Sequence, residues 1–99
     1  MYKYALMFYK GDQTEVNKEK ASHYFKSAAD KGHSISMHLY AGMNLNGDGI
    51  DSNKDEALNY SKKAADKDYL PSIFMYGILL LKDSNIEELN IYISEIFIQ

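Results

Sequence analysis

A block of four residues returns unchanged in this chain and sets a fixed period. Ala28-Ala29-Asp30-Lys31 is followed 36 positions later by Ala64-Ala65-Asp66-Lys67, with no gap needed between the copies. A fixed period of roughly 20–50 residues is typical of solenoids, in which each unit buries its apolar face against its neighbours. We therefore expect a repeat protein that serves as a binding surface. Eleven more residues recur at the same shift: Met1, Tyr4, Ala5, Met7, Gly11, Asp12, Asn17, Lys18, Ala21, Tyr24 and Lys26.

Each unit of the repeat is predicted to form two α-helices. Asn17 is a good N-cap, because its side-chain oxygen can accept hydrogen bonds from the free amides of a first turn. Apolar residues then recur at helical spacing, and Gly32 suits the left-handed conformation that ends a helix. Asp68 replaces that glycine in the second copy, where this conformation is harder to adopt. First helices are expected over residues 1–10, 34–46 and 70–82, and second helices after Asn17, Asn53 and Ser84.

The third unit departs from the period. Tyr92 lies 32 residues after Tyr60 instead of 36, so the loop between the two helices is shorter. The last segment is rich in β-branched residues, and propensity alone would allow a strand. We expect a helix, because its large apolar residues fall on one face and Ser84 and Glu87 match the S-x-x-E capping box. The prediction is a single all-α repeat domain of six helices in three hairpins, with units of approximately 1–33, 34–69 and 70–99.

The composition limits the expected partners and compartment. A net charge of −3 provides no basic field for phosphates, so nucleic acid is not an expected partner. The chain has no cysteine, which excludes disulfides and thiolate metal sites. Its longest apolar run, Ile73–Leu81, is nine residues, whereas a membrane helix needs about 20. The first residues do not form a signal peptide, because no long apolar region follows them. We therefore expect a cytoplasmic protein that does not bind membranes.

No group of residues matches a catalytic or metal-binding pattern. The three histidines, His23, His33 and His38, lack the i, i+4 spacing of a helical zinc site. The segment from Asn44 begins like a calcium-binding EF-hand loop, but its first position is not aspartate and its twelfth, Asp55, is shorter than the usual glutamate. Most carboxylates lie in predicted loops or first helical turns, where negative charge suits the helix dipole. We expect no catalytic residue, no metal and no cofactor.

The repeat resembles the Sel-one-like repeat family, a relative of the tetratricopeptide repeat. The family pattern combines a loop containing two glycines with an Ala-Ala pair at fixed spacing. The third unit carries only Tyr76-Gly77 at its Leu-Gly position, and mild departures occur at Ser36, Tyr40-Ala41, Asn44 and Asp68. The matching residues are Gly11, Asn17, Lys20, Ala21, Tyr24, Ala28, Ala29 and Gly32 in the first unit, and Gly47, Gly49, Ile50, Asn53, Ala57, Tyr60, Ala64 and Ala65 in the second.

This resemblance implies a right-handed α/α solenoid that works as an adaptor. Members of the family stack their hairpins into a superhelix and hold other proteins on the curved inner surface. The repeat contains no catalytic residues, so the resemblance implies a scaffold and not an enzyme. If the first helix of each hairpin lines the inner surface, as in tetratricopeptide units, the predicted concave face consists of Tyr2, Leu6, Tyr9, His38, Leu45, Phe74, Ile78 and Leu81.

The sequence leaves several uses of this fold open. The concave face could bind a partner peptide or protein, or a short array could curl or dimerise and bury it. The chain could also be a fragment of a longer array with a structural role. A small hydrolase, like the cysteine-rich penicillin-binding members of the family, is the third alternative, although those members rely on disulfides. Finally, the apolar residues Ile93, Ile96 and Phe97 predict self-association through the last helix as a homodimer.

Overall fold

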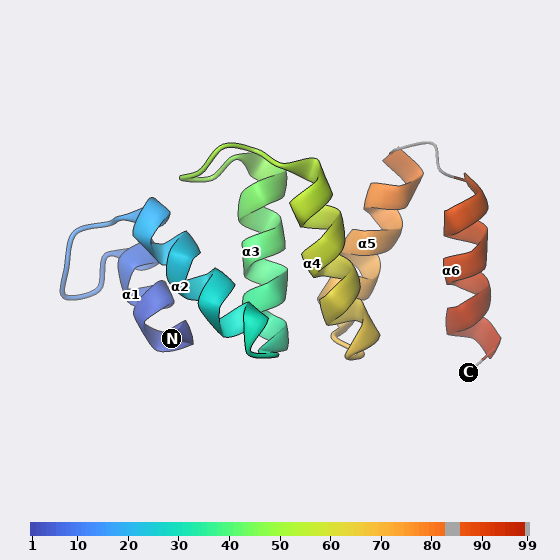
Figure 1. The fold of residues 1–99 in the computed structure, drawn as a ribbon, viewed down its shortest axis with the longest axis horizontal. Coiled ribbons are helices and arrows are strands. Elements are labelled where there is room, and N and C mark those ends of the chain that lie inside the picture. The colour runs from blue at the N-terminus through green and yellow to red at the C-terminus, as the bar shows by residue number, and fades with distance from the viewer. Residues whose placement is uncertain (83–85, 99) are drawn as a thin grey trace.

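A computed structural model describes residues 1–82 and 86–98, which form an elongated stack of helices (Figure 1). These residues contain no strand, and each helix packs mainly against its neighbours in chain order. The principal extents are 45 × 25 × 17 Å. The prediction of an all-α solenoid is therefore confirmed. The helices are α1 (Tyr2–Lys10), α2 (Lys18–Asp30), α3 (Ser34–Asn46), α4 (Lys54–Asp66), α5 (Leu70–Lys82) and α6 (Ile86–Ile98).

The sequence period is also a period of hydrogen bonds. The backbone N–H of Asn17 donates to the carbonyl of Phe8, and that of Asn53 donates to the carbonyl of Asn44, each at 2.8 Å. Both asparagine side chains accept an N–H from the third residue of the helix that they begin, at 3.0 and 3.1 Å. The predicted N-caps of α2 and α4 are thus confirmed. Because the same bonds close both loops, the first two hairpins have the same local geometry.

The ends of α2 and α4 also repeat. Gly32 has a φ of +97°, and Asp68 takes the same left-handed region with a φ of +62°. The N–H of the next residue, His33 or Tyr69, then bonds back to the preceding helix at 3.1 or 3.2 Å. The left-handed residue is therefore required by the turn, and Asp68 adopts it despite the penalty that its side chain brings.

A pair of tyrosine rings, one from each helix, recurs in every hairpin. The third pair keeps this arrangement although the spacing between its members is four residues shorter. The last hairpin therefore retains the inter-helix contact of the others. The ring centroids are 5.9 Å apart for Tyr4 and Tyr24, 4.9 Å for Tyr40 and Tyr60, and 4.9 Å for Tyr76 and Tyr92.

Small side chains allow the helices to approach closely in the first two hairpins. Ala41, Ala57 and Ala64 are fully buried where α3 and α4 meet. The third hairpin is looser, and α6 has no buried residue among those described. The predicted helix in this segment is confirmed, whereas its proposed capping box includes Ser84, which lies outside the described residues.

Candidate partner-binding face

A pocket of about 260 Å³ opens between α1 and α3. Three residues of the predicted concave face, Leu6, Tyr9 and His38, line it, together with Gly42. The pocket is therefore formed mainly by the first helices α1, α3 and α5, with contributions from α2 and from the loop after α3. Its other lining residues are the apolar Phe25, Leu39, Met43 and Met75 and the polar Lys10, Asn46 and Asp48.

Asp48 fixes one side of this pocket. The hydroxyl of Tyr9 donates to Oδ2 of Asp48, and Nζ of Lys18 lies 2.7 Å from Oδ1. These two donors, Lys18 first, hold the pKa of the Asp48 carboxyl below its usual range. The carboxylate in turn raises the pKa of the Tyr9 hydroxyl. The loop of the second hairpin is thereby joined to both helices of the first, and the Tyr9 ring is held in place at the pocket.

The histidines have three different settings. His33 is the N-cap of α3, where its Nδ1 accepts the N–H of Ser36 at 3.2 Å. His38 lies between α3 and α5, with its Nδ1 2.9 Å from Oγ of Ser72. Its ring centroid is 5.4 Å from that of Tyr69. His23 is exposed on α2. His33 therefore caps a helix, and His38 lies at a contact between two helices.

Burial of His38 predicts a pH dependence of stability. Desolvation lowers the pKa of its imidazole from the ordinary value of 6.5, so the unfolded state binds a proton more readily than the folded state. The stabilising contribution is complete above about pH 6.5 and is lost as the pH falls below it. We expect His38→Gln to flatten the decline in unfolding free energy between about pH 7.5 and pH 5. Urea titrations at each pH measure this, and His23→Gln is the matched control. An unchanged slope in His38→Gln would contradict the prediction.

The remaining residues of the predicted concave face are divided between two settings. Phe74, Ile78 and Leu81 are each more than half exposed and follow one another at helical spacing on α5. Tyr2 packs against α2 and its following turn, with its ring 4.7 Å from that of His33, and Leu45 is half-buried. The structure therefore gathers three of the predicted residues at a pocket and three in an exposed apolar stripe.

Several pocket residues are absent from the sequence-based set. Leu39 and Met75 occupy the same repeat position, 36 residues apart, and both line the pocket. Their shared apolar character at one register was a usable signal. The role of Asp48 had a weaker signal in the sequence, because its hydrogen bonds are to residues 30 and 39 positions away.

The stacked hairpins and the apolar side chains of their first helices define an α-helical repeat protein with a candidate binding surface. A sequence model described as the Sel1 repeat matches residues 1–33 and 34–69. The chain belongs to the Sel1 repeat family, as the motifs in its sequence indicated. Sel1 repeats are generally protein-interaction modules and typically non-enzymatic scaffolds. No curated protein matches the chain. Within the described residues, no helix has both the length and the apolar character needed to cross a membrane.

Proposed function

We propose that this protein is a non-enzymatic adaptor that binds a segment of a partner protein along its concave face. The observation that carries the proposal is the apolar stripe of Phe74, Ile78 and Leu81, which α5 exposes to solvent. Large apolar side chains in an exposed row are unfavourable in water and are typical of interaction sites. The same repeat positions on α3 and α1 include His38, Gly42 and Leu6 at the pocket, so the row continues along the solenoid.

The chemistry of this surface favours an amphipathic helix as the bound segment. Helix-in-groove recognition uses apolar anchors at i, i+3, i+4 and i+7 that fit a matching apolar groove. The apolar anchors of such a helix would pack on the exposed row of Phe74, Ile78 and Leu81 on α5. The pocket between α1 and α3 offers a separate site for one large anchor. We infer that the partner contributes an apolar helix face, with one side chain entering this pocket.

The carboxyl groups with shifted pKa values lie in structural contacts. Among the residues that the structure describes, two carboxyl groups have lowered pKa values, those of Asp30 and Asp48. Each is explained by donors that hold it in a structural contact: Tyr60 and Lys26 for Asp30, and Lys18 and Tyr9 for Asp48. A general acid or base needs a proton-transfer partner in a pocket and a pKa near the working pH. Lowered carboxyl pKa values oppose that requirement.

We further propose that residues 70–99 are a third, divergent unit of the same domain, which then spans residues 1–99. The contact between Tyr76 and Tyr92 supports this, because it reproduces the perpendicular ring pair of Tyr40 and Tyr60. The helix bounds of α5 also follow those of α3 at the 36-residue period.

Phe74→Ala is expected to lower the affinity for a bound partner at least tenfold. Truncating a buried aromatic anchor commonly costs about 2 kcal/mol of binding, whereas the exposed ring contributes little to the folded monomer. The partner is first captured with the unmodified chain and identified by mass spectrometry, and its dissociation constants are then compared by calorimetry. Lys63→Ala, on the second helix of the middle hairpin, is the control and should bind normally. Loss of binding in Lys63→Ala with none in Phe74→Ala would move the site to the other face.

A further inference from the structure

The pocket between α1 and α3 has a polar rim on one side. Lys10 and Asn46 line it and occupy the same repeat position, each as the last residue of its helix. Both residues are exposed, and neither side chain makes a hydrogen bond or an ion pair within residues 1–82 and 86–98. The rim therefore presents an ammonium group and an amide, both without partners there, beside an apolar interior.

The acidic residue at the pocket does not compensate the charge of Lys10. Asp48 is bound by two donors of the first hairpin, with Nζ of Lys18 2.7 Å from its Oδ1 and the Tyr9 hydroxyl on its Oδ2. Lys18 therefore neutralises Asp48, and no ion pair joins Asp48 to Lys10. The imidazole of His38, which also lines the pocket, is uncharged at neutral pH because burial lowers its pKa. The pocket thus retains the positive charge of Lys10.

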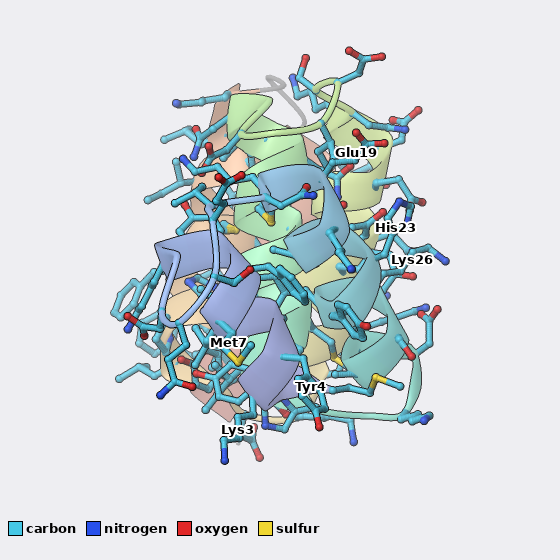
Figure 2. The ribbon with its side chains drawn as sticks, turned by 90° about the vertical axis from the view of Figure 1, so that its left-hand side faces the viewer. Lys3, Tyr4, Met7, Glu19, His23 and Lys26 are labelled. Atoms are coloured by element: carbon cyan, nitrogen blue, oxygen red, sulfur yellow. The ribbon has the colours of Figure 1, made fainter. Side chains whose placement is uncertain are left out.

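The first helices as a group carry charge of one sign. The helices α1, α3 and α5 contain Lys3, Lys10 and Lys82 and no acidic residue. The second helices α2, α4 and α6 contain six lysines and eight acidic residues. Seen from the α1 end, Glu19 and Lys26 lie along the α2 side of the stack (Figure 2). The first helices are therefore net positive in a chain whose net charge is −3.

This pattern defines the charge of a complementary partner. Opposite charges across an interface steer two surfaces together, whereas like charges are unfavourable. Residues three or four apart lie on the same face of a helix, so a glutamate one turn from an apolar anchor can reach the rim while the anchor occupies the pocket. Lys82 is exposed at the same repeat position on α5, so a longer segment would meet a second lysine.

We propose that the concave face selects an acidic amphipathic helix, in which one large apolar side chain enters the pocket and a neighbouring carboxylate pairs with Lys10. The inference rests on the proposed binding of a partner helix along this face, and it adds the charge of that helix. Lys10 is then a specificity-determining residue, because it discriminates between partner helices with the same apolar face.

Selection from a library of displayed helical peptides tests the proposal. Apolar positions of each peptide vary among leucine, isoleucine, methionine and phenylalanine, and polar positions among glutamate, glutamine and lysine. Peptides enriched on the unmodified protein should carry glutamate one turn from an apolar residue. Exchanging that glutamate for glutamine should lower the affinity roughly two- to fivefold, as expected for an exposed charge pair. Added salt should reduce this difference, because it screens surface charges.

Charge reversal at the rim provides the matched comparison. Lys10→Glu should lower the affinity for the glutamate peptide, and exchanging the peptide's glutamate for lysine should restore binding to this variant. Lys31→Glu changes the net charge equally and also stands at the end of a helix, α2, so it should bind like the unmodified protein. Calorimetry measures the affinities, and circular dichroism checks that each variant remains helical.

The outcomes separate this proposal from the proposed function. Enriched peptides without a preference for glutamate would overturn the acidic partner, yet leave binding on the concave face in place if Phe74→Ala still lowers their affinity. Equal losses in Lys10→Glu and Lys31→Glu would also overturn it, because overall charge would then govern binding. A library that yields no binder would overturn both proposals.

A last control addresses the other exposed apolar group. Ile93, Ile96 and Phe97 of α6 are 40%, 40% and 82% exposed. Phe97→Glu should therefore leave the selected peptides bound with unchanged affinity. Loss of binding in Phe97→Glu, with none in Lys10→Glu, would place the peptide on α6 and overturn the proposal.

Discussion

Gly49→Ala is expected to lower the free energy of unfolding by about 2–3 kcal/mol. Gly49 has a φ of +80°, a conformation that L side chains rarely adopt. An added Cβ would also lie 2.2 Å from Cβ and 3.2 Å from the backbone of Lys18. The backbone of Lys18 begins α2 and cannot shift without disturbing that helix. The loop of the second hairpin would therefore lose its contact with the first.

The same substitution at Gly42 is the matched control and should act in the opposite direction. Gly42 lies within α3, and its nearest neighbour for an added Cβ is Cε of Met75 at 4.0 Å. Alanine should therefore fit and raise the unfolding free energy by about 0.5–1 kcal/mol through its higher helix propensity. Urea denaturation of both variants measures the difference. Equal effects at the two glycines would contradict the close packing of the second loop on α2.

Most of the fold could be predicted because its determinants are local. The bounds of α3 and α5 agree with those expected from the sequence, residues 34–46 and 70–82. Asparagine caps, left-handed residues and helical spacing each act within a few positions, so they can be predicted from the sequence directly. Because of the 36-residue period, a signal found in one unit also predicts the same feature in the next, as the cap at Asn17 predicts one at Asn53.

The candidate site was less predictable, because it depends on how successive hairpins are rotated. Tyr9, Lys18 and Asp48 meet in space although Asp48 is 30 or more positions away from both. The sequence placed Asp48 in a loop but gave no orientation for that loop. Similarly, the choice of face along α5 identified Phe74 but not Met75, its neighbour at the pocket. Phe74, one position earlier and about 100° around the helix, does not line the pocket.

The last helix illustrates a conflict between local signals. Its isoleucines favour a strand by propensity, yet their spacing favours a helix, and the helix is what forms. The large side chains of α6 coincide with looser packing between the helices of this hairpin. Ile96 stands at the position that Ala64 occupies in the middle unit, and α6 packs less closely on α5 than α4 packs on α3. We therefore expect the size of the residue at this position to influence how closely the two helices of a hairpin pack.

Ala64→Leu should therefore be among the most destabilising single changes in the chain. Ala64 is fully buried in the core, and its carbonyl accepts the N–H of Tyr69 that closes the turn into α5. Leucine would replace a methyl group by a much larger one at a close helix contact, and overpacking typically costs about 1–3 kcal/mol. Asn59→Leu, on the exposed side of α4, adds a similar side chain and should change stability by less than about 0.5 kcal/mol.

Thermal and urea unfolding of Ala64→Leu and Asn59→Leu would test this packing argument directly. The larger residue at position 64 has two ways to be accommodated. Either α4 stays in place and strain lowers the unfolding free energy, or α4 moves away from α3 and exposes the ring pair of Tyr40 and Tyr60. Both routes lower stability, since the second also forfeits the hydrogen bond from Tyr60 to Asp30 that joins the first two hairpins. A melting temperature equal to that of the unmodified chain would mean that small residues do not control helix spacing in this repeat.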